Sequence, residues 1–197
     1  MNNYKEFKEF LENLTYRPKL LLHSCCGPCS TSVLERLSKY FDIDIYYYNP
    51  NIYPEAEYIK RLEEQEKLLK ELNINLIKGN YNYDLFLSTV KGLEKEKEGG
   101  SRCFSCMKMR MENSCLYAKE KGYDFFTTTL SVSSHKNSKM INEIGKELEQ
   151  KYNIPFLYSD FKKEDGYKRS IELSYKYGLY RQNYCGCQFS INHDKNI

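Results

Sequence analysis

Short apolar runs that alternate with amphipathic helical stretches constrain the fold of this chain more than any other feature. Five runs have the length and composition of buried strands: 19–23, 43–48, 74–79, 123–129 and 154–158. Apolar residues recur at helical spacing before and between them, over 4–14, 30–40, 58–72, 84–93, 103–121 and 138–151. This order predicts an α/β fold in which about five strands form a mostly parallel sheet with helices on both faces.

The length and the spacing of these elements predict a single domain over 1–197, because a chain of 197 residues buries most of its apolar surface in one core. Within it we expect an N-terminal helix in 1–18 and a charged, glycine-containing flexible linker over 94–102. A cysteine-bearing segment over 179–197 carries aromatic residues on both sides of its cysteines. We expect this segment to dock at the carboxyl edge of the sheet.

Cysteine is the second constraint. No stretch is apolar and long enough for a membrane span, and the first residues lack the apolar core of a signal peptide, so we expect a cytoplasmic protein with no membrane partner. In that reducing compartment, eight cysteines indicate metal binding or redox chemistry more than structural disulfides. The net charge of +3 permits an anionic partner such as RNA without requiring one.

The first cysteine group, HSCCGPCS at 23–30, falls in the loop between the first strand and the next helix, where parallel sheets bind ligands. Cys26-Gly-Pro-Cys29 has the sequence of a thioredoxin dithiol. Cys25 directly before the motif, and strands spread over some 140 residues, do not match that compact fold. We therefore treat thioredoxin activity as a minor hypothesis, and Cys29 as a metal ligand, a supporting thiol or a packing residue.

A second group supplies Cys103 and Cys106, a CxxC pair at a predicted helix start. Together with Cys25 and Cys26 it offers four sulfur atoms, the usual complement of a structural zinc site or a [4Fe-4S] cluster. Sulfur ligands alone do not distinguish the two metals. A structural zinc site therefore stays open as the simpler alternative.

The third group, Cys185 and Cys187, forms a CxC pair. Such a pair either binds metal or closes into a strained, readily reduced disulfide. Cys115 differs, because it shares a helical face with Met107 and Met111, which predicts a buried structural thiol.

Polar candidates follow two strands. His23 ends the first strand and either tunes the site or is a hydrogen-bonded strand-end residue. Ser134 and Lys136 follow the fourth strand in TTTLSVSSHKN, 127–137, and suit phosphate or ribose contacts, as does Arg181 at the end of the basic stretch 162–181. An ordinary polar loop and a solvated helix face are the alternatives for these segments.

The motifs HSCCGPCS, YNPNIYP, RCFSCMKMR, TTTLSVSSHK and LYRQNYCGCQFS, taken in this order from Leu20 onward, resemble the QueH-type epoxyqueuosine reductase family. The resemblance implies a cobalamin-independent iron–sulfur oxidoreductase. It would reduce the epoxide of epoxyqueuosine at the wobble position of a tRNA anticodon, the last step of queuosine biosynthesis, with electrons from a separate donor. It also implies a Rossmann-like (HUP-like) fold.

The resemblance assigns the [4Fe-4S] cluster to Cys25, Cys26, Cys103 and Cys106, and a redox-active disulfide to Cys185 and Cys187. Cys29 becomes a candidate ligand for an additional iron. In the related pyrophosphatase-loop enzymes the first loop carries a glycine-rich phosphate cradle; cysteines stand there instead, which argues against ATP.

Two other functions stay open at this stage. An iron–sulfur tRNA thiolation enzyme of related fold also acts on anticodon regions, but it is expected to carry the phosphate loop that is missing here. A zinc-stapled RNA-binding module would use the same cysteines without redox chemistry.

Overall fold

Four parallel strands form the central sheet of the computed structural model, which describes residues 3–158 and 160–191. They are β1 (Lys19–His23), β2 (Asp42–Tyr47), β3 (Asn75–Lys78) and β4 (Phe125–Thr128), in the order β3-β2-β1-β4. β1 is central, with Leu22 opposite Ile45 of β2 and Thr127 of β4. The uninterrupted apolar run of β1 is explained by this place, because a strand with helices on both sides buries both of its faces.

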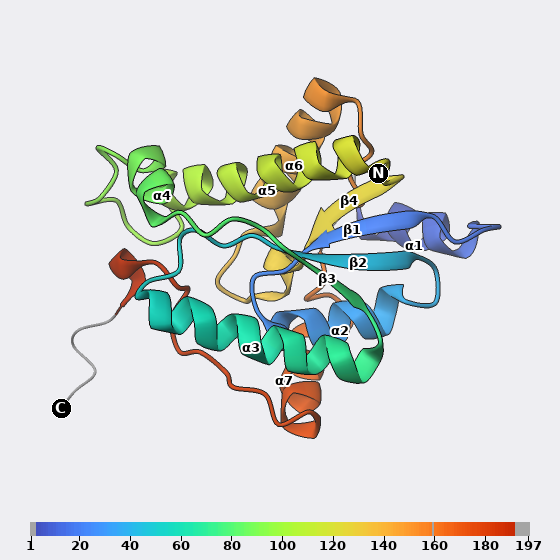
Figure 1. Cartoon of the computed structure of the whole chain (residues 1–197). Coiled ribbons are helices and arrows are strands. Elements are labelled where there is room, and N and C mark those ends of the chain that lie inside the picture. Colours follow the sequence, from blue (N-terminus) through green and yellow to red (C-terminus); the bar gives the residue numbers. More distant parts are fainter. Residues whose placement is uncertain (1–2, 159, 192–197) are drawn as a thin grey trace.

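Helices cover both faces of the sheet (Figure 1). One face carries α1 (Tyr4–Glu12), α2 (Gly27–Leu37), α3 (Glu55–Leu72) and α7 (Gly166–Lys176), and the other α5 (Ser101–Lys121) and α6 (Ser138–Tyr152). The side chains of β1 divide accordingly. Leu20 and Leu22 belong to the core under α1, α2 and α3, whereas Leu21 packs with Met107 and Ile144 under α5 and α6. The predicted α/β fold is therefore confirmed.

The sheet has four strands rather than about five. The segment 154–158 reaches β4 only through one bridge between Phe126 and Phe156, with Phe126 N donating to Pro155 O and Leu157 N to Phe126 O. Pro155 has no N–H to extend this ladder, and after Thr128 the chain turns into the 3-10 helix η1 (Thr129–Val132). The apolar pattern of 154–158 thus reports burial of this segment, not a full strand.

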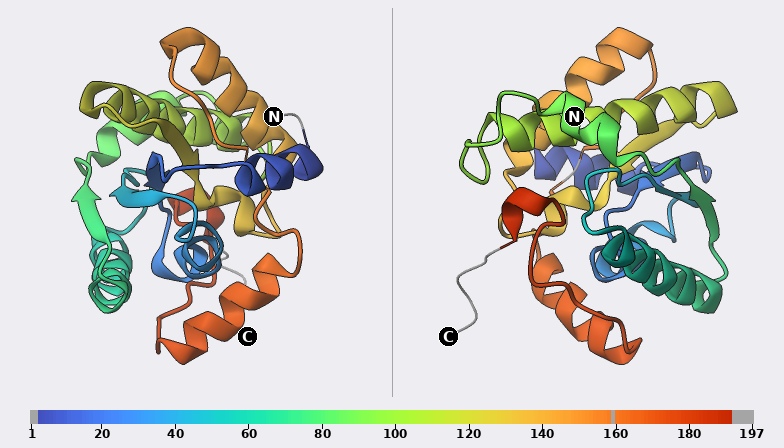
Figure 2. Two further views of the ribbon diagram at one scale, coloured as in Figure 1. Left: turned by 90° about the vertical axis from the view of Figure 1, so that its right-hand side faces the viewer. Right: turned by 60° about the vertical axis from the view of Figure 1, so that its left-hand side comes forward.

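The segments outside the sheet include the predicted linker, a short helix and the C-terminal segment. The predicted linker over 94–102 overlaps α5, which begins at Ser101, and buried Arg102 donates from Nη1 to the carbonyl oxygens of Glu94 and Glu96. Short α4 (Tyr83–Thr89) packs on α5. After α7 the chain runs back beside α3 to the 3-10 helix η2 (Gln188–Ser190), close to the beginning of α3 (Figures 1 and 2). The last six residues of the predicted segment 179–197, and residues 1–2 of 1–18, lie outside the described residues.

No helix in the described ranges combines the length and the apolar character needed to cross a membrane.

The contact between α6 and the 154–158 segment gives a test of the packing. Gly145 lies against Phe156, and a Cβ at Gly145 would lie 2.3–2.5 Å from three carbon atoms of that ring. We expect Gly145→Ala to lower the free energy of unfolding by about 1–3 kcal/mol, although alanine in a helix is intrinsically better than glycine by about 1 kcal/mol. Urea denaturation measures the change.

Lys146→Ala, at an exposed position of the same helix, is the matched control and should change stability little. A Gly145→Ala variant at least as stable as the parent would contradict the close packing of α6 on Phe156.

Candidate active site

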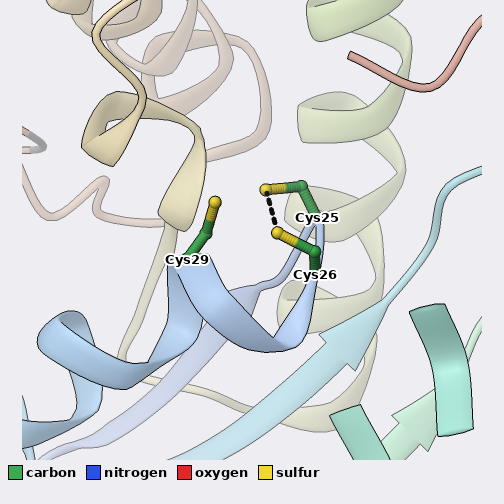
Figure 3. A group of neighbouring side chains, drawn as sticks. All are labelled: Cys25, Cys26 and Cys29. Carbon is green, nitrogen blue, oxygen red and sulfur yellow. Dashed lines mark hydrogen bonds between the residues drawn. The ribbon is translucent and has the colours of Figure 1, made fainter. Parts of the chain in front are cut away.

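Three sulfur atoms meet in the loop between β1 and α2. β1 ends at His23 and α2 begins at Gly27, with Cys26 as its extended N-cap residue. The Sγ atoms of Cys25, Cys26 and Cys29 all lie within 4.8 Å of one another, and those of Cys25 and Cys26 are 3.8 Å apart (Figure 3). In the part of the chain that the structure describes, no other three ligand atoms of Cys, His or acidic residues are grouped in this way.

The trio favours one negative charge on Cys25. Hydrogen bonds from the Cys26 and Cys29 thiols hold the pKa of Cys25 well below its usual value. The same hydrogen bonds raise the pKa of Cys26 to about 12 and that of Cys29 well above the usual value. A thiolate is the form of cysteine that binds metal. The loop therefore presents a soft, partly ionised sulfur site.

Cys103 and Cys106 stand outside this trio, in the first two turns of α5. Cys103 Sγ accepts a hydrogen bond from Gly99 N at 3.2 Å, and burial raises the pKa of Cys106 to about 11. The i, i+3, i+7 spacing of Cys103, Cys106 and Arg110 places all three on one helical face. The positive charge of Arg110 helps to lower the pKa of Cys25 and opposes the rise in the pKa of Cys106, so one sulfur of each cysteine group is within the electrostatic influence of the same guanidinium.

Arg110 is buried without a carboxylate partner among the described residues. It is 3% exposed, and its one hydrogen bond to a side chain runs from Nη2 to Asn49 Oδ1 at 2.6 Å, while its Nε has no partner. A buried guanidinium without an anion is costly. Its neighbourhood therefore suits an anionic occupant, and the sulfur donors suit a soft metal: the residues present fit a negatively charged metal–thiolate centre.

The C-terminal pair lies beside the same site in two different environments. All eight cysteines are free thiols in the structure. Cys185 Sγ accepts a hydrogen bond from Lys136 Nζ at 3.0 Å, whereas Cys187 is 7% exposed and packs with Cys106, Phe86 and Val90. Burial raises the pKa of Cys187. Burial acts to lower the pKa of Lys136, but the nearby Cys185 sulfur raises it above its usual value, so this ammonium stays charged.

Arg61 of α3 holds the C-terminal pair in place. It donates from Nη1 to Cys185 O at 3.1 Å and from Nη2 to Tyr184 O at 3.3 Å, and Nε pairs with Glu57 at 2.7 Å. Gly186 has φ +131°, and a Cβ there would lie 3.1 Å from Arg61 Nη1. The backbone angle favours glycine between the two cysteines, and a Cβ there would press on the Arg61 guanidinium.

A cavity of about 300 Å³ joins the two sulfur groups. The loop after β1 contributes Cys25, the first turn of α2 contributes Cys29, and the C-terminal segment contributes Cys185. Its charged and polar lining residues include the acidic Glu98 and, among others, Arg61, Arg110, Ser133, His135, Lys136, Arg181 and Gln182. A larger hollow of about 460 Å³ between α1, α2 and α7 contains no cysteine, and its charged residues include the ion pairs Lys8–Glu164 and Arg169–Glu35. The chemistry is therefore concentrated in the smaller cavity.

The polar residues predicted from sequence lie at different distances from this cavity. Lys136 and Arg181 line it, whereas exposed Ser134 does not. His23 lies beneath the site, fully buried, with Nδ1 2.8 Å from Thr128 Oγ1 and Nε2 3.1 Å from Tyr48 O. Burial lowers the pKa of His23 to about 3, so the ring stays neutral and ties together the ends of three strands.

Sequence reasoning missed Arg61, Arg110 and Gln182. Arg110 follows Cys106 by four residues, and this spacing could have indicated a shared helical face. Gln182 donates from Nε2 to Cys26 Sγ at 2.9 Å, and its buried Oε1 has no partner. Nothing in the local sequence signals the contacts of Arg61 or Gln182, because each joins segments more than 100 residues apart.

Comparison with known proteins shows a family that this chain matches over most of its length. A family model described as "Epoxyqueuosine reductase QueH" matches residues 20–193. The chain is similar to proteins of that name from three organisms. The Staphylococcus epidermidis protein is 46% identical, covering 88% of this chain and 76% of that protein. The proteins from Staphylococcus aureus (44% identity, 91% and 78% covered) and Thermotoga maritima (37% identity, 87% and 90% covered) are also similar.

Two solved structures share the fold at 13% identity. The U34-tRNA thiolase NcsA from Methanococcus maripaludis with its [4Fe-4S] cluster has a TM-score of 0.54, covering 95% of this chain and 67% of that chain. A predicted subunit of tRNA methyltransferase from Methanocaldococcus jannaschii has a TM-score of 0.52, with 78% and 76% covered.

Replacement of Arg61 tests how the C-terminal pair is held. Arg61→Gln removes the charged donors to the carbonyl groups of Tyr184 and Cys185 and breaks the ion pair with Glu57. We expect faster hydrogen–deuterium exchange in peptides that cover 180–191, because this segment loses its anchor on α3.

Lys70→Gln, at an exposed position of the same helix, is the control and should leave that exchange unchanged. Equal exchange in Arg61→Gln and the parent protein would show that other contacts hold the segment.

Proposed function

The chain belongs to the epoxyqueuosine reductase QueH family, and we propose on that basis that it reduces epoxyqueuosine to queuosine at the wobble position of a tRNA anticodon. The family match over residues 20–193 carries this proposal, supported by relatives of the same name at 35–46% identity. Because its substrate would be tRNA, we also propose that the chain acts in the cytoplasm. The iron–sulfur thiolation enzyme and the zinc-stapled module have no comparable support.

The chemistry of the reaction agrees with the composition of the cavity. Removal of an epoxide oxygen consumes two electrons and two protons and leaves a carbon–carbon double bond and water. Most side chains cannot supply electrons, so a dithiol or a bound redox cofactor must do so. The cavity is lined by sulfur on two sides, from Cys25 and Cys29 and from Cys185.

We assign the cofactor as a [4Fe-4S] cluster held by Cys25, Cys26, Cys103 and Cys106. The support is the buried Arg110, which has no carboxylate partner among the described residues and whose charge acts on the sulfurs of Cys25 and Cys106 and would offset that of thiolate ligands. When bound, such a cluster supplies electrons and a Lewis-acidic iron. Cys29, whose sulfur lies within 4.8 Å of Cys25 and Cys26, is our candidate ligand for an additional iron.

The remaining residues are proposed to bind substrate and pass electrons. Lys136 and Arg181 bring positive charge to the cavity wall, where an anticodon phosphate would be attracted. Tyr167, 38% exposed, also lines the cavity and offers a ring on which an unstacked base can lie. We propose that Cys185 and Cys187 form the redox-active pair. His23 and Ser134, which do not line the cavity, are the weaker substrate candidates.

Metal analysis tests the cofactor. Anaerobically purified protein should contain about four sulfides per chain with iron in excess of sulfide by about one, and should show a [4Fe-4S] electron paramagnetic resonance signal after reduction with dithionite. Cys103→Ser or Cys106→Ser should abolish this signal. Cys29→Ala should keep it and lose only iron beyond the cluster.

Cys115→Ser is the matched control, because Cys115 is a buried thiol of the same helix whose Sγ donates to Leu148 O. It should retain the cluster. Stoichiometric zinc with no iron after reconstitution would favour the zinc-stapled module instead.

The salt dependence of binding tests the tRNA interface. Lys168 is exposed on α7 beside the cavity-lining Tyr167, so Lys168→Gln should weaken tRNA binding. It should also reduce the slope of log affinity against log salt by about 0.7–0.9 if it loses one phosphate contact. Filter binding at salt concentrations from about 50 to 200 mM measures both the affinity and its dependence on salt.

Lys119→Gln is the charge-matched control, because Lys119 is exposed near the C-terminal end of α5, away from the cysteines at the start of that helix. Its tRNA binding should match that of the parent protein. tRNA binding whose affinity does not change with salt concentration would contradict the proposal that residues 127–137 and 162–181 form the tRNA interface.

A further inference from the structure

The two thiols of the C-terminal pair lie in different surroundings, and we infer from this that they have different roles. Cys185 exchanges with an external dithiol reductant, Cys187 is its buried partner, and Lys136 positions the Cys185 sulfur. The inference rests on the proposed function of Cys185 and Cys187 as a redox pair and adds the order in which they react and the chemical class of the electron donor.

Cys185 is the thiol that a second molecule can reach. It is partly exposed and lines the cavity, with Lys136 Nζ 3.0 Å from its Sγ. Lys162 Nζ donates to Lys136 O at 2.7 Å, and Arg61 donates to Cys185 O, so the backbone on both sides of the sulfur–ammonium contact is held. The contact is therefore part of an anchored arrangement between the segment after β4 and the C-terminal segment.

Cys187 is enclosed by apolar side chains. It does not line the cavity and packs with Phe86, Val90 and Cys106. Its Sγ donates to Ser190 Oγ at 3.6 Å, and the backbone of Phe189 also contacts it. Phe189, whose ring lies 4.9 Å from the guanidinium carbon of Arg102, packs against the same cluster. An external thiol has no open approach to this sulfur.

Gly186, between the two cysteines, explains why the Cys185 side chain lines the cavity while the Cys187 side chain lies among apolar residues. Gly186 adopts φ +131°, Tyr53 N donates to its carbonyl at 2.8 Å, and its own N–H donates to Ser190 Oγ at 3.3 Å. In the free-thiol form that the structure shows, these bonds hold the peptide that links the two cysteines. One side chain consequently enters the cavity and the other the apolar cluster.

Accessibility sets the sequence of steps in thiol–disulfide exchange. A thiolate of the reductant attacks Cys185 Sγ, the Cys185–Cys187 bond breaks, and its electron pair goes to Cys187 Sγ, which takes a proton. The second thiol of the reductant then attacks its own sulfur in the mixed disulfide and releases Cys185 Sγ beside Lys136, and Cys185 takes the proton that this second thiol gives up. The reductant dithiol is oxidised to a disulfide, and the pair gains the two electrons and two protons that epoxide removal consumes.

Lys136 acts as a positioning residue in this scheme. Its ammonium donates to Cys185 Sγ and would stabilise the negative charge of that sulfur when it attacks or leaves. Cys187 has no cation in hydrogen-bond contact among the described residues. Loss of the ammonium should therefore slow reactions of Cys185 and leave Cys187 unaffected.

Thiol reactivity tests the proposal without turnover. The reduced, cluster-containing protein is treated briefly with iodoacetamide, and fragment ions locate the label, because no Lys or Arg separates the two cysteines for trypsin. We expect Cys185 to react at least about tenfold faster than Cys187. With glutathione disulfide as the probe, Cys187→Ser should form a stable mixed disulfide at Cys185, whereas Cys185→Ser should form none at Cys187.

Variants of Lys136 separate positioning from a structural role. Lys136→Met should slow labelling of Cys185 by about tenfold without changing that of Cys187, and Lys136→Arg should restore most of the rate. Lys139→Met, at an exposed position three residues on, is the matched control and should leave both rates unchanged.

Labelling of Cys187 at the rate of Cys185, or an unchanged Cys185 rate in Lys136→Met, would overturn the assignment. Neither readout uses tRNA, so failure of the proposed reductase activity would appear separately, as absence of queuosine despite the expected order of labelling.

Discussion

A buried guanidinium requires negative charge nearby, and the arrangement of the site follows from how Arg110 meets this requirement. With no carboxylate partner among the described residues, Arg110 has Asn49 as its hydrogen-bond partner and influences the sulfur atoms of Cys25 and Cys106. Its charge thereby links the loop after β1 with the first turns of α5. The same charge that would destabilise an empty apolar pocket favours thiolates, and with them a metal, at this place.

The parallel sheet brings the partners of Arg110 together. Each strand ends at the same edge, so the segments after β1, β2 and β4 deliver Cys25, Asn49 and Lys136 to one region. Neutral His23 ties these strand ends by contacts with Thr128 and Tyr48 O. Burial removes its capacity to titrate near neutral pH. A charged imidazole there would add a second uncompensated cation below the cysteines.

The sequence predicted the sheet because the buried strands are apolar on both faces and recur between amphipathic helices, a local pattern. It overestimated the strand count, because Pro155 and the turn after β4 limit pairing in a way that apolar composition does not reveal. The cysteine groups were visible as motifs, and their assigned roles stay predictions. The contacts of Lys136 with Cys185 and of Arg61 with Cys185 O depend on tertiary structure, since 49 and 124 residues separate the partners.

The Cys26-Gly-Pro-Cys29 motif shows how its surroundings change what a dithiol can do. A thioredoxin-type nucleophile needs an accessible first cysteine with a lowered pKa. Here Cys26 is 1% exposed, its sulfur accepts a hydrogen bond from Gln182, and the contact with Cys25 raises its pKa to about 12. The lowered pKa belongs instead to Cys25, the residue before the motif, and all three sulfurs converge. This loop is therefore suited to ligate rather than to exchange, and exchange chemistry falls to the sulfur across the cavity, Cys185.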